Sequence, residues 1–287
     1  MYLVFGNNID IHKQANFSIL TFLTQKKVIN KIIVVTDSPK YYNHITDDKF
    51  KIESITEQQL SEWKGPHNYF WRIKIKSIEY IFKKHPNHSI IYLDADTFLF
   101  KDLDSISELL NNGFNVMHIN EGKLSAIKSK TTSKMWKQIQ NKTFGSITIN
   151  EQHCMWNAGV VGISKVHSES SISEALTICD QMCSNNITDR LIEQFALSLA
   201  LNSISKLISV EHQIGHYWGN KKEWNKVIDD FFLTALFSSL TFEEQQKMIE
   251  ELNFSKIAVN IKIPNTRIRL IKKITKLFPD KYKIFMG

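Results

Sequence analysis

The segment from Ile90 to Thr97 reads Ile-Ile-Tyr-Leu-Asp-Ala-Asp-Thr and places two carboxylates directly after an apolar run. A short apolar run of this kind predicts a strand buried on both faces. Because successive side chains of a strand alternate, Asp94 and Asp96 are expected to point to the same side. Desolvated carboxylates need a counter-charge, and hard oxygen ligands suit Mg²⁺ or Mn²⁺. The sequence therefore predicts a divalent-metal site at the carboxyl end of a strand, where ligands of such sheets usually bind.

Other interpretations of this triplet stay open at the level of the sequence. Acids with this spacing also occur in solvated turns, and Asp102 and Asp104 just downstream are examples. The segment Asp94-Ala-Asp96-Thr97 also fits the D-x-D-x-T nucleophile loop of haloacid-dehalogenase-like phosphatases, where the first aspartate attacks phosphorus and the second is a general acid. That loop normally follows the first strand of its domain, whereas about ninety residues precede it here. A degenerate site kept for binding alone is the third interpretation, and the metal site is favoured.

A second candidate site lies between Glu211 and Trp224, where His216, Gly219 and Lys222 are spaced three residues apart. A neutral histidine can complete a metal shell begun by carboxylates. Glycine lets backbone N–H groups approach phosphate oxygens, and lysine offers a compact positive charge to the same oxygens. The alternative is a surface loop with aromatic packing.

Two weaker segments could contact a sugar. Asn157 and Gly159 precede an apolar strand, and the amide could bind sugar hydroxyls or could be a turn residue. Glu193 and Gln194 stand at the start of a helical pattern, where an acid–amide pair is usually solvated.

The elements that position these residues alternate between strands and helices, which predicts a mostly parallel, doubly wound α/β sheet. Predicted strands cover residues 2–5, 31–36, 51–55, 90–93, 115–119 and 156–164. Predicted helices cover residues 16–26, 70–84, 104–111, 171–183 and 189–201. The helix at 70–84 carries Arg72 and Lys74, from which a cation could reach a leaving phosphate, although a solvated face is the commoner role.

Composition is that of an ordinary soluble protein of 287 residues, 43% hydrophobic and 23% charged. No stretch approaches the roughly 20 apolar residues that span a bilayer, and the N-terminus has no evident signal peptide. Three cysteines without C-x-x-C spacing suggest a reducing compartment and no structural zinc. We therefore expect a cytoplasmic protein.

The net charge of +7 is concentrated at the C-terminus, because residues 255–287 hold nine basic residues and one acidic residue. Within residues 265–278, apolar residues form one helical stripe among lysines and arginines. Such a helix can lie on an anionic membrane surface, or it can dock on the protein itself or on a second copy. A nucleic-acid partner is not expected, since the rest of the chain is almost neutral. We predict two domains, a catalytic domain at 1–225 and a helical basic appendage at 226–287.

Several motifs, taken in order, carry a resemblance to a known family. They are Val4-Phe-Gly-Asn-Asn8, the basic residue Arg72, Tyr92-Leu-Asp-Ala-Asp-Thr97, Asn157-Ala-Gly159, Glu193-Gln194 and His216-x-x-Gly219-x-x-Lys222-x-Trp224. The chain resembles the family-8 glycosyltransferases, the glycogenin-like and lipopolysaccharide hexosyltransferases with the A-type nucleotide-sugar fold. The resemblance covers roughly residues 1–225.

The resemblance implies a Rossmann-like mixed sheet that binds a nucleotide sugar and transfers its sugar to a hydroxyl. It implies that Mn²⁺ or Mg²⁺ binds to Asp94, Asp96 and His216. Donor contacts would come from Gly6, Asn8, Arg72, Asp94, Asp96, Asn157, Gly159, Gly219 and Lys222, and Gln194 with Glu193 would lie beside the anomeric carbon.

Three departures from the family pattern bear on the acceptor and on the stereochemistry. Glu193 replaces the usual aspartate, Glu223 replaces a common proline, and only 21 residues separate Gln194 from His216. Asn8 also stands where the family usually has an acid. Retention of configuration is expected from the resemblance, whereas inversion would follow if Glu193 deprotonates the acceptor.

The favoured function is therefore transfer from a UDP-hexose to a bacterial surface glycan or lipid-linked saccharide, such as lipopolysaccharide or capsule. The enzyme would be cytoplasmic or peripheral on the inner face of the membrane. The alternatives are a phosphohydrolase with Asp94 as nucleophile and a non-catalytic membrane-peripheral adaptor.

Overall fold

A seven-stranded sheet is the centre of the computed structural model, which describes residues 1–25, 27–261 and 265–277. The strands lie in the order β12-β6-β11-β4-β1-β2-β3. All neighbours are parallel except β11, which runs antiparallel to both β4 and β6. The order β3-β2-β1-β4 is that of half a Rossmann fold, so the expectation of a mostly parallel α/β sheet is confirmed.

The strands of the sheet are β1 (Tyr2–Leu3), β2 (Ile32–Thr36), β3 (Phe50–Ser54), β4 (Ile90–Leu93), β6 (Asn115–Met117), β11 (Val160–Ile163) and β12 (Leu207–Ser209). Three small hairpin-like pairs lie outside it, β5 (Thr97–Leu99) with β13 (Ile214–His216), β7 (Asn120–Lys123) with β10 (Cys154–Trp156), and β8 (Thr143–Phe144) with β9 (Ile147–Thr148).

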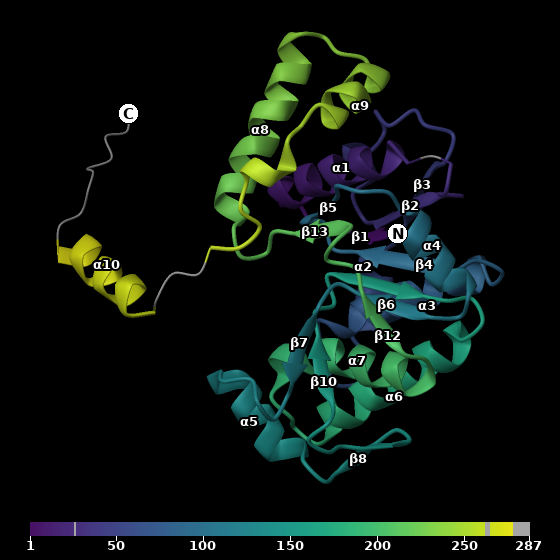
Figure 1. Ribbon diagram of the computed structural model, residues 1–287, viewed down its shortest axis with the longest axis vertical. Helices are drawn as coiled ribbons and strands as arrows, with labels where there is room; N and C mark the ends of the chain where they lie inside the picture. Colours follow the sequence, from purple (N-terminus) through teal and green to yellow (C-terminus); the bar gives the residue numbers. More distant parts are fainter. Residues whose placement is uncertain (26, 262–264, 278–287) are drawn as a thin grey trace.

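The helices are α1 (Ile9–Leu23), α2 (Glu57–Trp63), α3 (Arg72–Lys84), α4 (Asp104–Asn111), α5 (Lys130–Ile139), α6 (Ser168–Ser184), α7 (Ile192–Ile204), α8 (Lys221–Phe237), α9 (Phe242–Glu250) and α10 (Asn265–Leu277). Short 3₁₀ turns are at Pro39–Tyr41, Asp189–Leu191 and Phe254–Lys256. Helices cover both faces of the sheet, with α1, α8 and α9 on one side and α3, α6 and α7 on the other (Figure 1).

Two predicted elements differ from the structure for local reasons. The helix expected at residues 16–26 begins at Ile9, because the Asn8 side chain accepts a hydrogen bond from the Asp10 amide and caps the helix. The strand expected at residues 156–164 is two strands, β10 and β11, and the Asn157–Gly159 turn between them lies at the candidate site.

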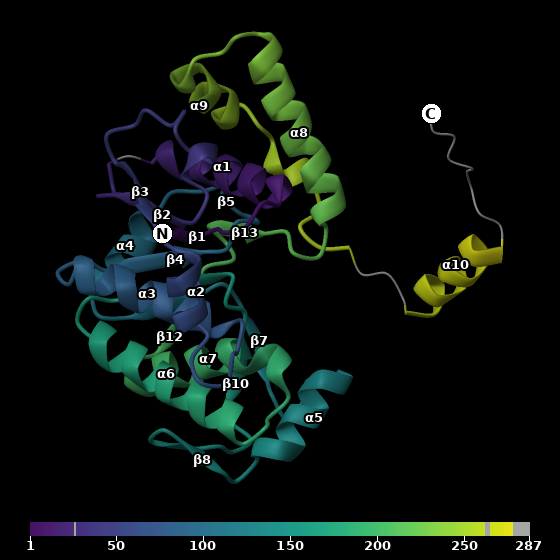
Figure 2. The ribbon, with the colours of Figure 1, turned by 180° about the vertical axis from the view of Figure 1, so that it is seen from behind.

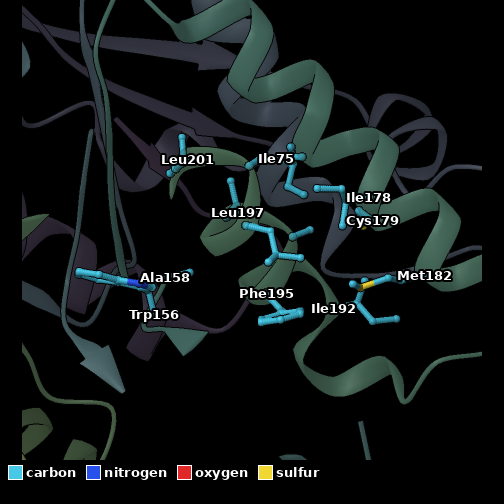
Figure 3. Close-up of a cluster of buried hydrophobic side chains, with 14 of the residues drawn as sticks. Ile75, Trp156, Ala158, Ile178, Cys179, Met182, Ile192, Phe195, Leu197 and Leu201 are labelled. Atoms are coloured by element: carbon cyan, nitrogen blue, oxygen red, sulfur yellow. The ribbon is translucent and has the colours of Figure 1, made fainter. Parts of the chain in front are cut away.

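The hydrophobic core on the α6–α7 side of the sheet fixes the position of Glu193 and Gln194. Phe195 and Leu197 of α7 pack among Ile178 and Met182 of α6, and Trp156 and Ala158 lie beside them (Figure 3). Because α7 is buried along most of its length, its first turn, with Glu193 and Gln194, is held rigidly at the edge of the sheet.

The second core lies between the sheet and the α1, α8 and α9 layer. Phe17 of α1 meets the rings of Trp224 and Phe231 of α8, and Ile249 of α9 is buried in the same cluster. Helix α8 therefore continues across the predicted boundary at residue 225 without a break, and the helices after it share this core. Only α10 stands apart from the body, in both views (Figures 1 and 2).

Candidate functional site

The predicted site residues gather at one edge of the sheet because the parallel strands end there. Asp94 follows β4, and His118 follows β6. Strand β11 runs the other way, so the Asn157–Gly159 turn that precedes it enters at the same edge; Asp94 N–H donates to the Gly159 carbonyl at 2.8 Å. The topology thus joins segments that are more than sixty residues apart in the chain.

Asp94, Asp96 and His216 form a group whose ligand atoms lie within 4.8 Å of one another. Strand β13 brings the histidine, since it pairs with β5 in the register His216 to Thr97. The His216 Nε2 lies 3.4 Å from an Asp96 oxygen and 4.0 Å from an Asp94 oxygen. Two carboxylates and one imidazole are a donor set that fits Mn²⁺ or Mg²⁺.

Charge around Asp96 keeps it ionised. Burial raises the pKa of the Asp96 carboxyl, but the adjacent His216 and Lys221 lower it, and the net pKa is well below the ordinary value. The backbone carbonyl of Asp96 accepts the Tyr217 amide at 3.1 Å, which fixes the β5–β13 connection beside the carboxylate. The group therefore presents a fixed anion to a cation.

Asn157 orients the imidazole. Its Oδ1 accepts hydrogen bonds from the Gly159 amide and from His216 Nδ1, each at 3.0 Å. The backbone N–H of Gly159 can only donate, so the Asn157 side-chain atom that faces it must be the oxygen. Because this oxygen accepts from His216 as well, the imidazole proton is on Nδ1. The Nε2 atom is then the one that faces the two aspartates, which is the tautomer that a metal ligand needs. Asn157 thus fixes the orientation of the His216 ring.

The His216 ring lies against the Cα atom of Gly159. A Cβ at this position would overlap the Cε1 and Nδ1 atoms of the ring. Gly159 is therefore required because the His216 ring approaches its Cα atom closely, and not because of an unusual backbone conformation.

We expect Gly159→Ala to displace His216 and to weaken Mn²⁺ affinity about 10- to 100-fold, because an orienting contact of a metal ligand is lost. Isothermal titration with Mn²⁺ measures the effect. In a His216→Ala background the same substitution should cost almost nothing further. A full additional loss in that background would show that Gly159 acts on something other than the histidine.

Of the two basic residues expected from α3, it is Lys74 that contacts Asp94. Lys74 Nζ lies 3.2 Å from an oxygen of Asp94 and 3.2 Å from an oxygen of Glu193, and it donates to the Ala158 carbonyl at 3.1 Å. Arg72 instead makes a two-pronged ion pair with Asp180 of α6, at 2.6 and 2.9 Å. The two residues are two positions apart on α3, so a helix turn of about 200° separates their side chains and only one can face the site. The role of Arg72 at the site stays a prediction, and in this structure its guanidinium is paired with Asp180.

Glu193 is buried, and its carboxylate is paired with Lys74. Burial raises the pKa of Glu193, and Lys74 opposes that rise. For Lys74, burial lowers the pKa, but Asp94 and Glu193 raise it above its ordinary value. Lys74 is therefore charged and bridges the carboxylates of Asp94 and Glu193.

Gln194 belongs to a second set of hydrogen bonds, centred on Glu121. Gln194 Nε2 donates to one oxygen of Glu121 at 3.2 Å, and Asn157 Nδ2 donates to the other at 3.3 Å. Glu121 lies on β7 and is exposed, so a substrate can reach it. The contacts run from Gln194 through Glu121 and Asn157 to His216.

At the start of α8 the structure places Lys221 at the site. Lys221 and Lys222, the position expected from the motif, are both exposed on the first turn of the helix, and the Lys221 Nζ lies 2.8 Å from an Asp96 oxygen. Gly219 forms a bridge with Asn260, whose side chain occupies the space that a Cβ would need. Its small size is thus used at least in part for packing with the C-terminal segment.

The first loop is held from within the protein. The Gly6 amide donates to both oxygens of Asp37 at 3.0 and 3.1 Å, its carbonyl accepts from His12, and its φ of 82° favours glycine. Asn8 caps α1, because its side-chain oxygen accepts a hydrogen bond from the Asp10 amide.

Sequence reasoning missed Glu121, Lys221 and His118 as members of this site. His118 is buried between His216 and the Ile214 carbonyl, and burial and the neighbouring imidazole lower its pKa to about 4. Only Lys221 had a signal in the sequence, as the neighbour of Lys222. His118 lies within the strand predicted at residues 115–119 and Glu121 follows that strand, but nothing local marks either as a site residue.

Comparison with known proteins identifies a family for this chain. The model of glycosyl transferase family 8 matches residues 4–169. No curated protein sequence matches the chain. Among solved structures, mouse xyloside xylosyltransferase 1 in its apo form is similar, with 11% identity and a TM-score of 0.46 over 73% of this chain and 84% of that chain.

Proposed function

The chain belongs to glycosyl transferase family 8, and from that premise we propose that it moves a sugar from a nucleoside diphosphate donor to an acceptor hydroxyl with the help of Mn²⁺ or Mg²⁺. The observation that carries the proposal is the convergence of Asp94, Asp96 and His216 from two distant segments. We infer a UDP-hexose as the donor and a surface glycan or lipid-linked saccharide as the acceptor.

The three ligand residues would hold a divalent ion, which neutralises charge on a diphosphate as its bond to the sugar breaks. Lys221 lies at the same carboxylate and can turn to a phosphate oxygen when a substrate diphosphate enters. Lys222 and the Gly219 amide, on the same turn, can add contacts to that diphosphate. These residues together favour departure of the nucleotide.

On the sugar side, Gln194 and Asn157 offer amide groups at fixed positions, and positioning of this kind lowers the barrier to transfer. Glu193 is poorly suited to deprotonate an acceptor, because it is buried and paired with Lys74. That pairing supports retention of configuration over inversion.

The alternatives from the sequence do not survive these findings. Family membership makes the phosphohydrolase and the non-catalytic adaptor wrong as classes.

Thermal unfolding with UDP, GDP and ADP, each with and without Mn²⁺, tests the proposed function. We expect one nucleotide to raise the melting temperature only in the presence of the metal, because ligand binding stabilises the folded state by mass action. Hydrolysis of the matching nucleotide hexose in the absence of an acceptor should follow the same metal dependence. No shift with any nucleotide would contradict the proposal.

Glu121 should act by holding the two amides. We expect Glu121→Ala to lower kcat about tenfold, since two hydrogen bonds that position Gln194 and Asn157 are lost. Glu121→Gln, whose amide oxygen can still accept one of these bonds, should retain most of the activity. If Glu121 were instead a general base, both variants would lose activity equally and the acidic limb of the pH–rate profile would vanish.

A further inference from the structure

Helix α10 has the amphipathic character of a surface-binding helix. Leu270, Ile271, Ile274 and Leu277 are each at least half exposed, with values of 58, 50, 50 and 73%. Their spacing of one, three and three residues places them on one stripe of the helix. The helix lies away from the body in both views (Figures 1 and 2), so nothing on the body covers this stripe.

The charge of α10 fits an anionic partner. Its thirteen residues include five lysines and arginines and no acid, and the described side chains Arg267 and Lys273 are exposed. The basic excess of the whole protein lies in this region of the sequence, whereas the rest of the chain is nearly neutral. An anionic surface would therefore attract this end of the molecule and leave the body unaffected.

The helix is attached next to the metal site. The Ile261 amide contacts the Gly219 carbonyl at 3.4 Å, and the Ala258 carbonyl accepts hydrogen bonds from Asn220 and Trp224 at 2.7 and 3.1 Å. Gly219 is three residues from the metal ligand His216. Four residue steps from Ile261 to Asn265 reach at most about 14 Å, so α10 stays close to this turn.

Exposed apolar side chains also surround the point of attachment. Trp218 is 54% exposed, Val259 41% and Ile261 40%. Tryptophan is favoured at the boundary between lipid and water, where an apolar ring and a polar N–H are both accommodated. These three side chains add exposed apolar surface to the part of the body from which the segment leading to α10 departs.

We propose that α10, together with Trp218, Val259 and Ile261, binds an anionic lipid bilayer and places the opening of the metal site at the membrane surface. The membrane contact itself is independent of the proposed function. Its consequence, that the acceptor is carried by the membrane, rests on the proposed function. No helix in the described part of the chain is long and apolar enough to cross a bilayer. The contact is therefore with the surface.

Two other occupants of the stripe are distinguishable from a bilayer. A second copy would pair through apolar residues, but it would bring two strongly basic helices together, which like-charge repulsion opposes. Docking on the body would bury the stripe, but that body is nearly neutral and offers little charge complementarity. An anionic bilayer satisfies both the stripe and the charge.

Vesicle flotation of the full chain tests the inference, with phosphatidylcholine alone or mixed with phosphatidylglycerol. We expect binding only to the mixed vesicles and release by high salt. Arg267→Glu with Lys273→Glu, and separately Leu270→Ser with Ile274→Ser, should each lower the partition coefficient about tenfold or more. The matched control is Lys130→Glu with Lys134→Glu on α5, which reverses two exposed charges elsewhere and should bind like the natural protein.

Proximity of the site to the lipid has its own readout. Brominated lipid in the mixed vesicles should quench part of the tryptophan emission, and Trp218→Phe should remove most of that quenching. Equal flotation of all variants, or quenching that is unchanged by Trp218→Phe, would overturn the inference. A concentration-dependent dimer that dissociates with Leu270→Ser and Ile274→Ser, without vesicle binding, would do the same.

The melting shift with nucleotide and Mn²⁺, measured on the same preparations, separates this inference from the proposed function. Loss of vesicle binding with an intact nucleotide shift contradicts only the membrane contact. Vesicle binding without any nucleotide shift contradicts only the proposed function.

Discussion

Asp96→Ala is expected to lower sugar transfer about 10³-fold, because it would remove one of the three side chains proposed to hold the divalent ion. The substitution also leaves His216 and Lys221 without their anionic partner. Transfer from the nucleotide hexose, followed by product formation with and without added Mn²⁺, measures the loss.

Asp102→Ala is the matched control for this experiment. Asp102 is an exposed acid six residues downstream, and removing it changes the net charge by the same amount. We expect its activity to match that of the natural protein. Equal activity of Asp96→Ala and Asp102→Ala would remove Asp96 from the mechanism.

Lys74→Met is expected to have the largest effect on stability as well as a severe effect on activity. It leaves the buried carboxylate of Glu193 and the half-buried one of Asp94 without their shared cation. Breaking a buried ion pair by removing one partner costs about 3 kcal/mol or more. Urea unfolding monitored by circular dichroism at neutral pH measures the change in the free energy of unfolding.

The pH dependence of that loss identifies its cause. Burial raises the pKa of Glu193, and Lys74 opposes the rise, so the pKa of Glu193 should be higher still in the variant. The deficit in stability should then be largest above this pKa and should shrink as pH falls through it, because Glu193 takes up a proton in the folded state. Adding Glu193→Gln should recover part of the stability at neutral pH. A deficit that is independent of pH and unchanged by Glu193→Gln would show that only packing was lost.

The group of Asp94, Asp96 and His216 could be expected from the sequence because its signals are local. An apolar strand that ends in Asp-Ala-Asp, and the spacing of His216 and Gly219, can both be recognised without knowledge of the fold. The sheet could be predicted for the same reason. Each strand and helix shows its own spacing of apolar residues, and the two kinds of element alternate along the chain. The element ends were less certain, and α1 starts earlier than expected because Asn8 is a cap.

What could not be predicted depends on contacts between distant segments. The choice of Lys74 over Arg72 depends on the rotation of α3 about its axis and on Asp180, which lies more than a hundred residues away. Glu121 joins the site only because Asn157 and Gln194 arrive from other elements. The reason for Gly159 is the His216 ring, which no pattern around the glycine reveals.

The positions of these residues also explain how one site can join three tasks. Lys74 links the metal side to Glu193, Asn157 links His216 to Glu121, and the turn at Gly219 links the metal ligand to the segment that carries α10. The proposed binding of a donor, placement of an acceptor and contact with a membrane would therefore meet within a few residues of His216.

A crystal grown with Mn²⁺ and UDP, with anomalous diffraction used to locate the manganese, tests the central claim most directly. We predict one manganese peak at about 2.2 Å from oxygens of Asp94 and Asp96 and from Nε2 of His216, bridged to the diphosphate of the nucleotide. A nucleotide bound elsewhere, or manganese held without these three side chains, would contradict the account.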